Sequence, residues 1–161
     1  MLQMQVEVVG IDQVSMQPVV ILSDLAQKGF LILVIGEAEA TAISFAMRKL
    51  DPPRPLTHDV MSSILRDLEV KVEKIVITEL VNETYYAAIY LKTRNKRLIF
   101  DARPSDSIAL ALHTDAPIYI SEQIASLVLP DQQRYSDDDL VRFRKFLETI
   151  TPDDFRYQKP E

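Results

Sequence analysis

The dipeptide Arg-Pro occurs twice in this chain of 161 residues, at Arg54-Pro55 and at Arg103-Pro104, and each copy is followed by a hydroxyl and an acid. Proline followed by Ser or Thr and then by an acid is typical of a helix N-terminus, because the hydroxyl caps free N–H groups and the helix dipole favours the acid. An arginine just outside such an end adds a fixed cation. Each copy therefore predicts a helix end suited to an anion such as phosphate.

Several acids near these helix ends could hold a hard divalent cation through oxygen, and metal-activated water cleaves phosphodiesters. A structural alternative stays open for each acid, since each stands in the first turn of a predicted helix, where it could simply cap N–H groups. These acids are Glu39, Asp59 and Asp106. The residues alone therefore suggest phosphodiester chemistry without a diagnostic metal motif or a glycine-rich phosphate loop.

Two further residues have similar alternatives. His58 follows Thr57 at the edge of an apolar helix face, where a histidine often fills space and donates one hydrogen bond. Arg103 stands between a strand end and a helix start, and its fork of donors needs a carboxylate or phosphate partner. An internal salt bridge from Arg103 to Asp101 or Asp59 competes with phosphate binding.

Composition excludes several classes of protein. The chain has no cysteine, which removes disulfides, thiolate metal sites and cysteine nucleophiles, and its two histidines argue against a His-rich zinc site. The net charge of −6 disfavours binding of nucleic acid through the whole surface but permits a local basic cleft. The longest apolar run, residues 30–35, is far too short to span a bilayer, so we expect a cytoplasmic protein without a membrane partner.

The apolar periodicity predicts three strands followed by two helices, and then the same order again. The strands are expected over residues 2–8, 18–25, 30–35, 70–80, 85–92, 97–102 and 118–120. The helices are expected over residues 37–50, 57–68 and 105–113, and from residue 121 onward. The buried face of the second helix is predicted to consist of residues 60, 61, 64, 65 and 68. A last amphipathic helix is expected from a cap at Ser136 to a stop near Pro152.

This order predicts an α+β fold in which two related three-strand, two-helix units share one core and a C-terminal helix follows. The units are residues 1–68 and 69–129, since similar helix sequences recur at an offset of 65 residues. Coincidence between two αβ segments is the alternative to duplication.

Four blocks of the sequence, in order and in spacing, resemble the bifunctional nuclease (BFN) domain. They read IGEAEATAI at 35–43, RPLTHD at 54–59, DARPSDSIALAL at 101–112 and APIYI at 116–120. The resemblance assigns residues 1–130 to a bifunctional nuclease-like domain and leaves 131–161 as a C-terminal helical extension. It implies a small α+β protein with DNase and RNase activity that forms a homodimer or a higher homo-oligomer. The positions that match the family motifs are Glu39, Arg54, Thr57, His58, Asp59, Asp101, Arg103, Ser105 and Asp106.

The resulting hypothesis is a nuclease, and so a hydrolase, that acts on nucleic acid. We expect the catalytic residues to be Glu39, His58, Asp59 and Asp106, with His58 as the proton carrier. The expected phosphate-binding residues are Arg54, Arg103, Thr57 and Ser105. A divalent metal, Mg²⁺ or Mn²⁺, is expected on some of Glu39, Asp59 and Asp106.

The alternative is a non-catalytic dimeric binding or regulatory module that uses the same helix ends to hold an anionic ligand or a partner's carboxylate. Burial of Arg103 in closed salt bridges would favour this module. An open cleft lined by both Arg-Pro loops would favour the nuclease.

Overall fold

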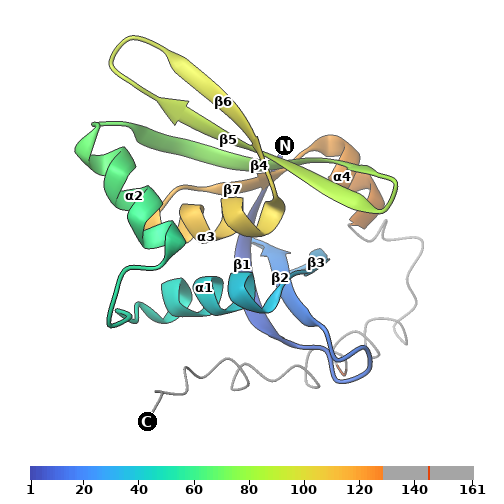
Figure 1. Ribbon diagram of the computed structural model, residues 1–161. Coiled ribbons are helices and arrows are strands. Elements are labelled where there is room, and N and C mark those ends of the chain that lie inside the picture. The colour runs from blue at the N-terminus through green and yellow to red at the C-terminus, as the bar shows by residue number, and fades with distance from the viewer. Residues whose placement is uncertain (129–144, 146–161) are drawn as a thin grey trace.

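One mixed sheet of seven strands organises the part of the chain that the computed structural model describes, residues 1–128 and residue 145. The elements follow the order predicted from the sequence (Figure 1). The strands are β1 (Leu2–Ile11), β2 (Pro18–Asp24), β3 (Phe30–Val34), β4 (Lys71–Val81), β5 (Thr84–Lys92), β6 (Arg97–Ala102) and β7 (Ile118–Ile120). The helices are α1 (Glu37–Arg48), α2 (Thr57–Asp67), α3 (Pro104–Thr114) and α4 (Glu122–Val128). The expected C-terminal helix, residues 136–152, lies outside the described residues.

The sheet has the strand order β3-β2-β1-β7-β4-β5-β6. Two antiparallel meanders, β1 to β3 and β4 to β6, therefore lie on either side of the short strand β7. β7 pairs antiparallel with β1 and parallel with β4, and Ile118 lies opposite both Met4 and Ile75. The α+β class is confirmed. The two related units and the boundary at residue 130 stay predictions.

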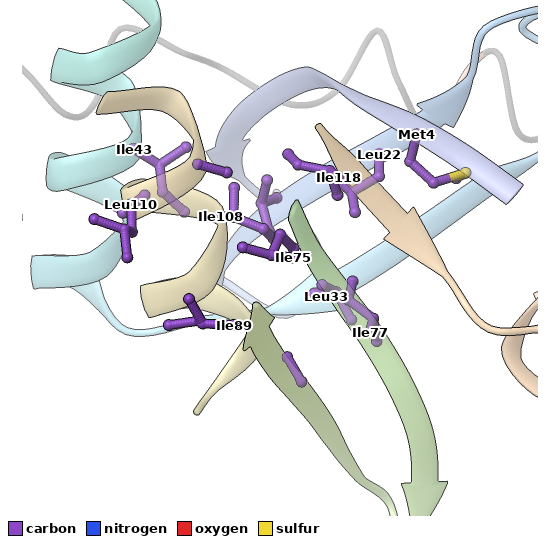
Figure 2. Packing of buried hydrophobic residues seen from close by; sticks show 14 of the residues in the cluster. Met4, Leu22, Leu33, Ile43, Ile75, Ile77, Ile89, Ile108, Leu110 and Ile118 are labelled. Atoms are coloured by element: carbon purple, nitrogen blue, oxygen red, sulfur yellow. The ribbon is translucent and has the colours of Figure 1, made fainter. Parts of the chain in front are cut away.

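The core forms between one face of the sheet and the helices α1 and α3. Buried side chains of β2 and β4, such as Leu22 and Ile75, meet Ile43 of α1 and Ile108 of α3 in one cluster (Figure 2). Burying a side chain of this size stabilises the fold by about 1.5–3 kcal/mol. α1 packs beside α3, and α3 contacts both α2 and the strands β4 and β5. This packing holds the three helices in one layer and fixes the side chains at their N-termini.

The predicted buried face of α2 is partly wrong. Val60, Ile64 and Leu68 are 45%, 54% and 67% exposed, whereas Met61 and Leu65 are only partly exposed and pack against the core. The buried residue of this helix is His58, at 6% exposure. Val60, Ile64 and Leu68 are exposed because α2 packs mainly against α3 rather than lying flat on the sheet. A helix that packs against one neighbouring helix buries a narrower stripe of its own surface than its apolar periodicity predicts.

The predicted hydroxyl caps are also wrong. α2 has Leu56 as its N-cap and α3 has Arg103, and neither helix has a side-chain cap hydrogen bond. Pro104 takes the first helical position, where its fixed φ and missing N–H are tolerated, so Ser105 falls inside the first turn. In α2 the carboxylate of Asp59 instead accepts the backbone N–H of Leu56, at 2.8 Å.

Within residues 1–128, no helix has the length and apolar character needed to cross a membrane.

Candidate functional site

Arg103 connects two helices at their N-terminal ends. Its Nε donates to Oδ2 of Asp106 on α3 at 2.6 Å, and its Nη2 donates to Oε1 of Glu39 on α1 at 2.8 Å. Both carboxylates raise the pKa of the Arg103 guanidinium, led by the hydrogen bond to Asp106. A guanidinium carries five N–H donors, so about three remain for another partner. The Arg103 side chain is 65% exposed, which leaves those donors accessible.

Asp106 is shared between Arg103 and a histidine of α2. Its Oδ1 lies 3.1 Å from Nε2 of the buried His58. Partial burial by itself raises the pKa of Asp106, but the hydrogen bonds from Arg103 and His58 outweigh this effect and lower it below its usual value. Asp106 is therefore ionised at neutral pH. Glu39, Arg103, Asp106 and His58 form one continuous polar chain across α1, α3 and α2.

Gly36 makes room for the carboxylate of Glu39. A Cβ built at residue 36 would overlap Oε2 of Glu39, so the carboxylate occupies the space that any larger residue would fill. The backbone of Gly36 is extended, with φ of −80°, and the requirement is therefore close approach rather than an unusual conformation. Gly36 was not among the residues predicted for the site. The available signal was a glycine directly before a predicted helix and three residues before Glu39.

A cavity of about 530 Å³ opens beside this polar chain. Its lining includes six residues from both Arg-Pro loops and from the three helix ends: Glu39, Pro55, Thr57, His58, Arg103 and Asp106. The two dipeptides are 49 positions apart in the sequence, yet their loops meet at one cavity. Together with the exposure of Arg103, this arrangement favours the nuclease hypothesis over the binding module.

Five of the predicted site residues meet at this cavity, and three do not. Glu39, Thr57, His58, Arg103 and Asp106 line it. Arg54 is exposed and lies outside the lining, and Ser105 is 6% exposed, buried in the first turn of α3. Asp59 is also outside the lining.

Asp59 belongs to a second histidine–carboxylate pair. Its Oδ1 lies 3.5 Å from Nδ1 of His113 near the end of α3, and both side chains are largely buried. Its Oδ2 accepts the Leu56 N–H already described. Asp106 and His113 both lie on α3, and each of them pairs with a different residue of α2.

The three acids predicted to hold a metal do not form one group. Glu39 and Asp106 lie on either side of Arg103, and Asp59 faces His113. Among residues 1–128 there is no group of three or more histidine, aspartate or glutamate side chains positioned to hold a metal ion. The guanidinium already supplies positive charge between Glu39 and Asp106, so this arrangement does not fit a three-carboxylate centre. The divalent metal stays a prediction from the sequence.

The fold and the site together define a class of small α+β domain in which helix N-termini meet at one polar cavity. The family model for the bifunctional nuclease domain matches residues 20–129, which is more than half of the chain. The chain belongs to this family, and the resemblance inferred from the four sequence blocks is confirmed.

Relatives in bacteria and plants agree with this assignment. An uncharacterized protein of Mycobacterium tuberculosis is 34% identical over 163 residues, covering 94% of this chain and 98% of the relative. Bifunctional nuclease 1 of Oryza sativa subsp. indica is 28% identical over 98 residues, covering 59% of this chain and 30% of the rice protein. Bifunctional nuclease 2 of Arabidopsis thaliana is 26% identical over 98 residues, with the same two coverages.

Proposed function

We propose that this protein is a nuclease that hydrolyses phosphodiester bonds in DNA and RNA, with the cavity beside Arg103 as its active site. The observation that carries the proposal is the geometry of Arg103, which two carboxylates hold in place while its side chain stays 65% exposed. A guanidinium fixed in this way is preorganised to bind a phosphate through its remaining donors. The family membership and the plant relatives named bifunctional nucleases support the reaction class.

In the proposed mechanism, Arg103 binds the scissile phosphate and stabilises the charge that develops as water attacks phosphorus. His58 takes a proton from the water and returns one to the oxygen of the leaving nucleotide, while the P–O bond to that oxygen breaks. Asp106 orients the imidazole through Nε2, at 3.1 Å, which leaves Nδ1 for the proton transfer. Glu39 is a positioning residue, because it acts on the substrate through Arg103.

Metal assistance is a separate proposal, supported by the oxygen chemistry of Glu39, Asp59 and Asp106 and not by their arrangement. The steps above use no metal. A divalent cation could bind Glu39 or Asp106 only if Arg103 broke its ion pair with that carboxylate, or it could arrive already bound to the substrate. Hydrolysis measured with and without EDTA distinguishes these cases, since a metal-dependent reaction stops in EDTA and resumes when Mg²⁺ or Mn²⁺ is restored.

The test of the nuclease proposal is hydrolysis of single-stranded DNA and RNA by highly purified protein, beside the variants Glu39→Gln and Asp106→Asn. We expect Asp106→Asn to lower kcat/KM by about 100-fold or more, since it alters both Arg103 and His58. Glu39→Gln should lower kcat/KM by about 10-fold, since it weakens one of the two carboxylate contacts that hold Arg103 in place.

Matched controls are Glu37→Gln, in the same helix turn as Glu39, and Asp51→Asn, an exposed acid of the following loop. Both controls should retain full activity, and thermal unfolding should show that all four variants are folded. Unchanged hydrolysis by both Glu39→Gln and Asp106→Asn would assign the activity to a contaminant or to another site.

The binding-module alternative is favoured by the two internal ion pairs of Arg103, which already satisfy part of its charge. A phosphorothioate oligonucleotide separates the two functions, because it resists hydrolysis and still carries phosphate charge. Binding of this probe that depends on Arg103, without hydrolysis of ordinary DNA or RNA by the wild-type protein, would support the alternative.

We further propose, from the family resemblance, that the protein acts as a homodimer in the cytoplasm. The exposed apolar residues Leu56, Val60, Ile64 and Leu68, which recur every four positions along α2, support a contact with a second copy. Light scattering should give a mass near twice 18.4 kDa. A mass of one chain across the micromolar range contradicts the dimer.

A further inference from the structure

A second cavity, of about 390 Å³, lies against the C-terminal half of α2. Its lining includes Ser62 and Arg66 of α2, Glu69 of the following turn, Lys71 at the start of β4, and His113 at the end of α3. None of these residues lines the first cavity, which is formed by the N-terminal residues Thr57 and His58 of the same helix. One helix therefore borders both cavities.

The two cavities differ in charge. The second has two cations, Arg66 and Lys71, against one acid, Glu69, which gives a net charge of +1 with neutral His113. Glu69 is paired with Arg94 outside the lining, and Arg66 lies 3.6 Å from Asp67. Within the described part of the chain, Lys71 has no ion-pair partner.

The first cavity has Glu39 and Asp106 against Arg103, a net charge of −1 with neutral His58. Counted over the lining residues alone, the second cavity is therefore the more favourable of the two for an anion, although Asp67 beside Arg66 and Asp59 beside His113 offset part of its positive charge.

His113 is held at the wall of the second cavity by Asp59. The carboxylate approaches Nδ1 at 3.5 Å, and its other oxygen is fixed by the N–H of Leu56 at 2.8 Å. A carboxylate on one ring nitrogen fixes the orientation of an imidazole and leaves Nε2 as the nitrogen available to a ligand. The titratable and charged groups around this imidazole are Asp59 and Arg66 of α2, Glu69 of the turn and Lys71 of β4.

We propose that the second cavity is a phosphate-binding subsite for the same nucleic-acid strand whose scissile phosphate lies in the first cavity. Lys71 and Arg66 would contact a phosphate by charge, and His113 would donate or accept a hydrogen bond through Nε2. The inference rests on the proposed nuclease function and adds to it a second contact for the strand, which a dinucleotide bound in the first cavity is too short to reach.

The distance between the cavities sets the length of strand that reaches both. Residues 58 and 66 of α2 border one cavity each and are separated by eight positions, or about 12 Å of helix. Stacked nucleotides rise about 3.4 Å each along a B-form strand, so this distance corresponds to at most about four nucleotides, and a more extended single strand covers it with fewer. A dinucleotide in the first cavity should therefore leave the second one empty, and an octanucleotide should occupy both.

The test uses the two histidines of the chain, because each lines a different cavity. Their imidazole NMR signals report on the two cavities separately, without any need for hydrolysis. The probes are phosphorothioate oligothymidylates of two and eight nucleotides. We expect the dinucleotide to shift the signal of His58 alone and the octanucleotide to shift the signals of both His58 and His113.

Lys71→Glu should abolish the response of His113, weaken octanucleotide binding by about 10-fold and reduce the salt dependence of that binding by about one unit of slope. The response of His58 to the dinucleotide should be unchanged. Lys28→Glu is the matched control, since it makes the same charge change at an exposed lysine in the turn between β2 and β3.

The outcomes separate the two proposals. An octanucleotide that shifts His58 but not His113, or that binds Lys71→Glu as well as it binds Lys28→Glu, overturns the second subsite and leaves the nuclease proposal standing. A shift of His113 without any shift of His58 and without hydrolysis of unmodified DNA or RNA supports the second cavity as a binding site and overturns the active-site assignment.

Discussion

The helices α2 and α3 are joined by two histidine–carboxylate pairs that run in opposite directions. In one pair α2 supplies His58 and α3 supplies Asp106, with a distance of 3.1 Å, and in the other α2 supplies Asp59 and α3 supplies His113, with a distance of 3.5 Å. The chemistry of the two pairs is the same, but their surroundings differ. Asp106 also binds Arg103 beside a cavity, whereas Asp59 also accepts a backbone N–H of its own helix.

We propose that the third partner of each pair determines its function. In the proposed mechanism, the carboxylate shared with the exposed Arg103 connects the proton carrier to the phosphate-binding group. A carboxylate shared with a helix N-terminus mainly fixes an element in place. We therefore expect the first pair to control hydrolysis and the second to control helix packing and the binding of longer strands.

Removal of Arg103 should have the largest effect. Arg103→Ala removes the proposed phosphate-binding group and leaves Glu39 and Asp106 without their shared cation, so kcat/KM should fall by about 100- to 1,000-fold. Arg103→Lys keeps the charge and loses the planar fork, and it should recover only part of the activity. Arg97→Ala serves as the control, because it breaks an ion pair between the edge strand β6 and Glu73 of β4. Equal activity of Arg103→Ala and Arg97→Ala would remove Arg103 from the mechanism.

Separate replacement of the two histidines tests the comparison between the two histidine–carboxylate pairs directly. His58→Gln should lower kcat/KM by about 100-fold, because glutamine cannot carry the proton. His113→Gln should change the hydrolysis of a dinucleotide less than about 3-fold, because it leaves the first cavity intact. Similar losses in the two variants would contradict the difference in function between the pairs.

Substitution of Gly36 should have a smaller effect that depends on Glu39. The new methyl group of Gly36→Ala would displace the carboxylate of Glu39, and kcat/KM should fall by about 10-fold as Arg103 loses one of its two anchors. In a Glu39→Gln background, Gly36→Ala should lower kcat/KM much less, since the contact between residue 39 and Arg103 is already weakened. Additive losses in the double variant would show that Gly36 acts through some other contact.

The smallest expected effect concerns stability in acid. The pKa of Asp106 is lowered in the folded protein, so its ion pair stabilises the fold above the unfolded value of 3.8, and this stabilisation is lost as the pH falls through the folded pKa. Asp106→Asn should therefore melt about 3 °C below the wild type at pH 7, for a loss of about 1 kcal/mol, and the two melting temperatures should approach each other as the pH falls below 3.8 and through the folded pKa. A difference in melting temperature that stays constant as the pH is lowered would exclude the ion pair as its source.

Much of the fold could be predicted because strands and helices depend on local periodicity. The strand at 97–102 was predicted without error, and the helix starts at residues 37 and 57 agree with the structure. The strand order was not predictable in the same way, since β7 inserts between β1 and β4, and its partners lie far away in the sequence. The exposed face of α2 was missed for a related reason, because the width of a buried stripe depends on what the helix packs against.

The candidate site was predictable as a set of residues but not as a network. Helix-end chemistry pointed to Glu39, His58, Arg103 and Asp106, which do line one cavity. It also pointed to Arg54, Ser105 and Asp59, which do not. The expected partners of Arg103 were Asp101 or Asp59, whereas the observed partners are Asp106 and the distant Glu39. No spacing rule connects residues 39 and 103, because only the contact between α1 and α3 brings them together.

The sequence by itself determined the type and order of the elements, the α+β class and the residues with the chemistry to bind phosphate, since each of these follows from side-chain pattern and helix-end preference. The tertiary structure alone decided that the two Arg-Pro loops share a cavity, that Asp106 rather than Asp59 joins Arg103 to a histidine, and that the carboxylate of Glu39 lies where a side chain at residue 36 would stand. The physical reason is distance. Ion pairs and close contacts act over a few ångströms, and the packing of α1, α2 and α3 on the sheet sets which atoms come within that range.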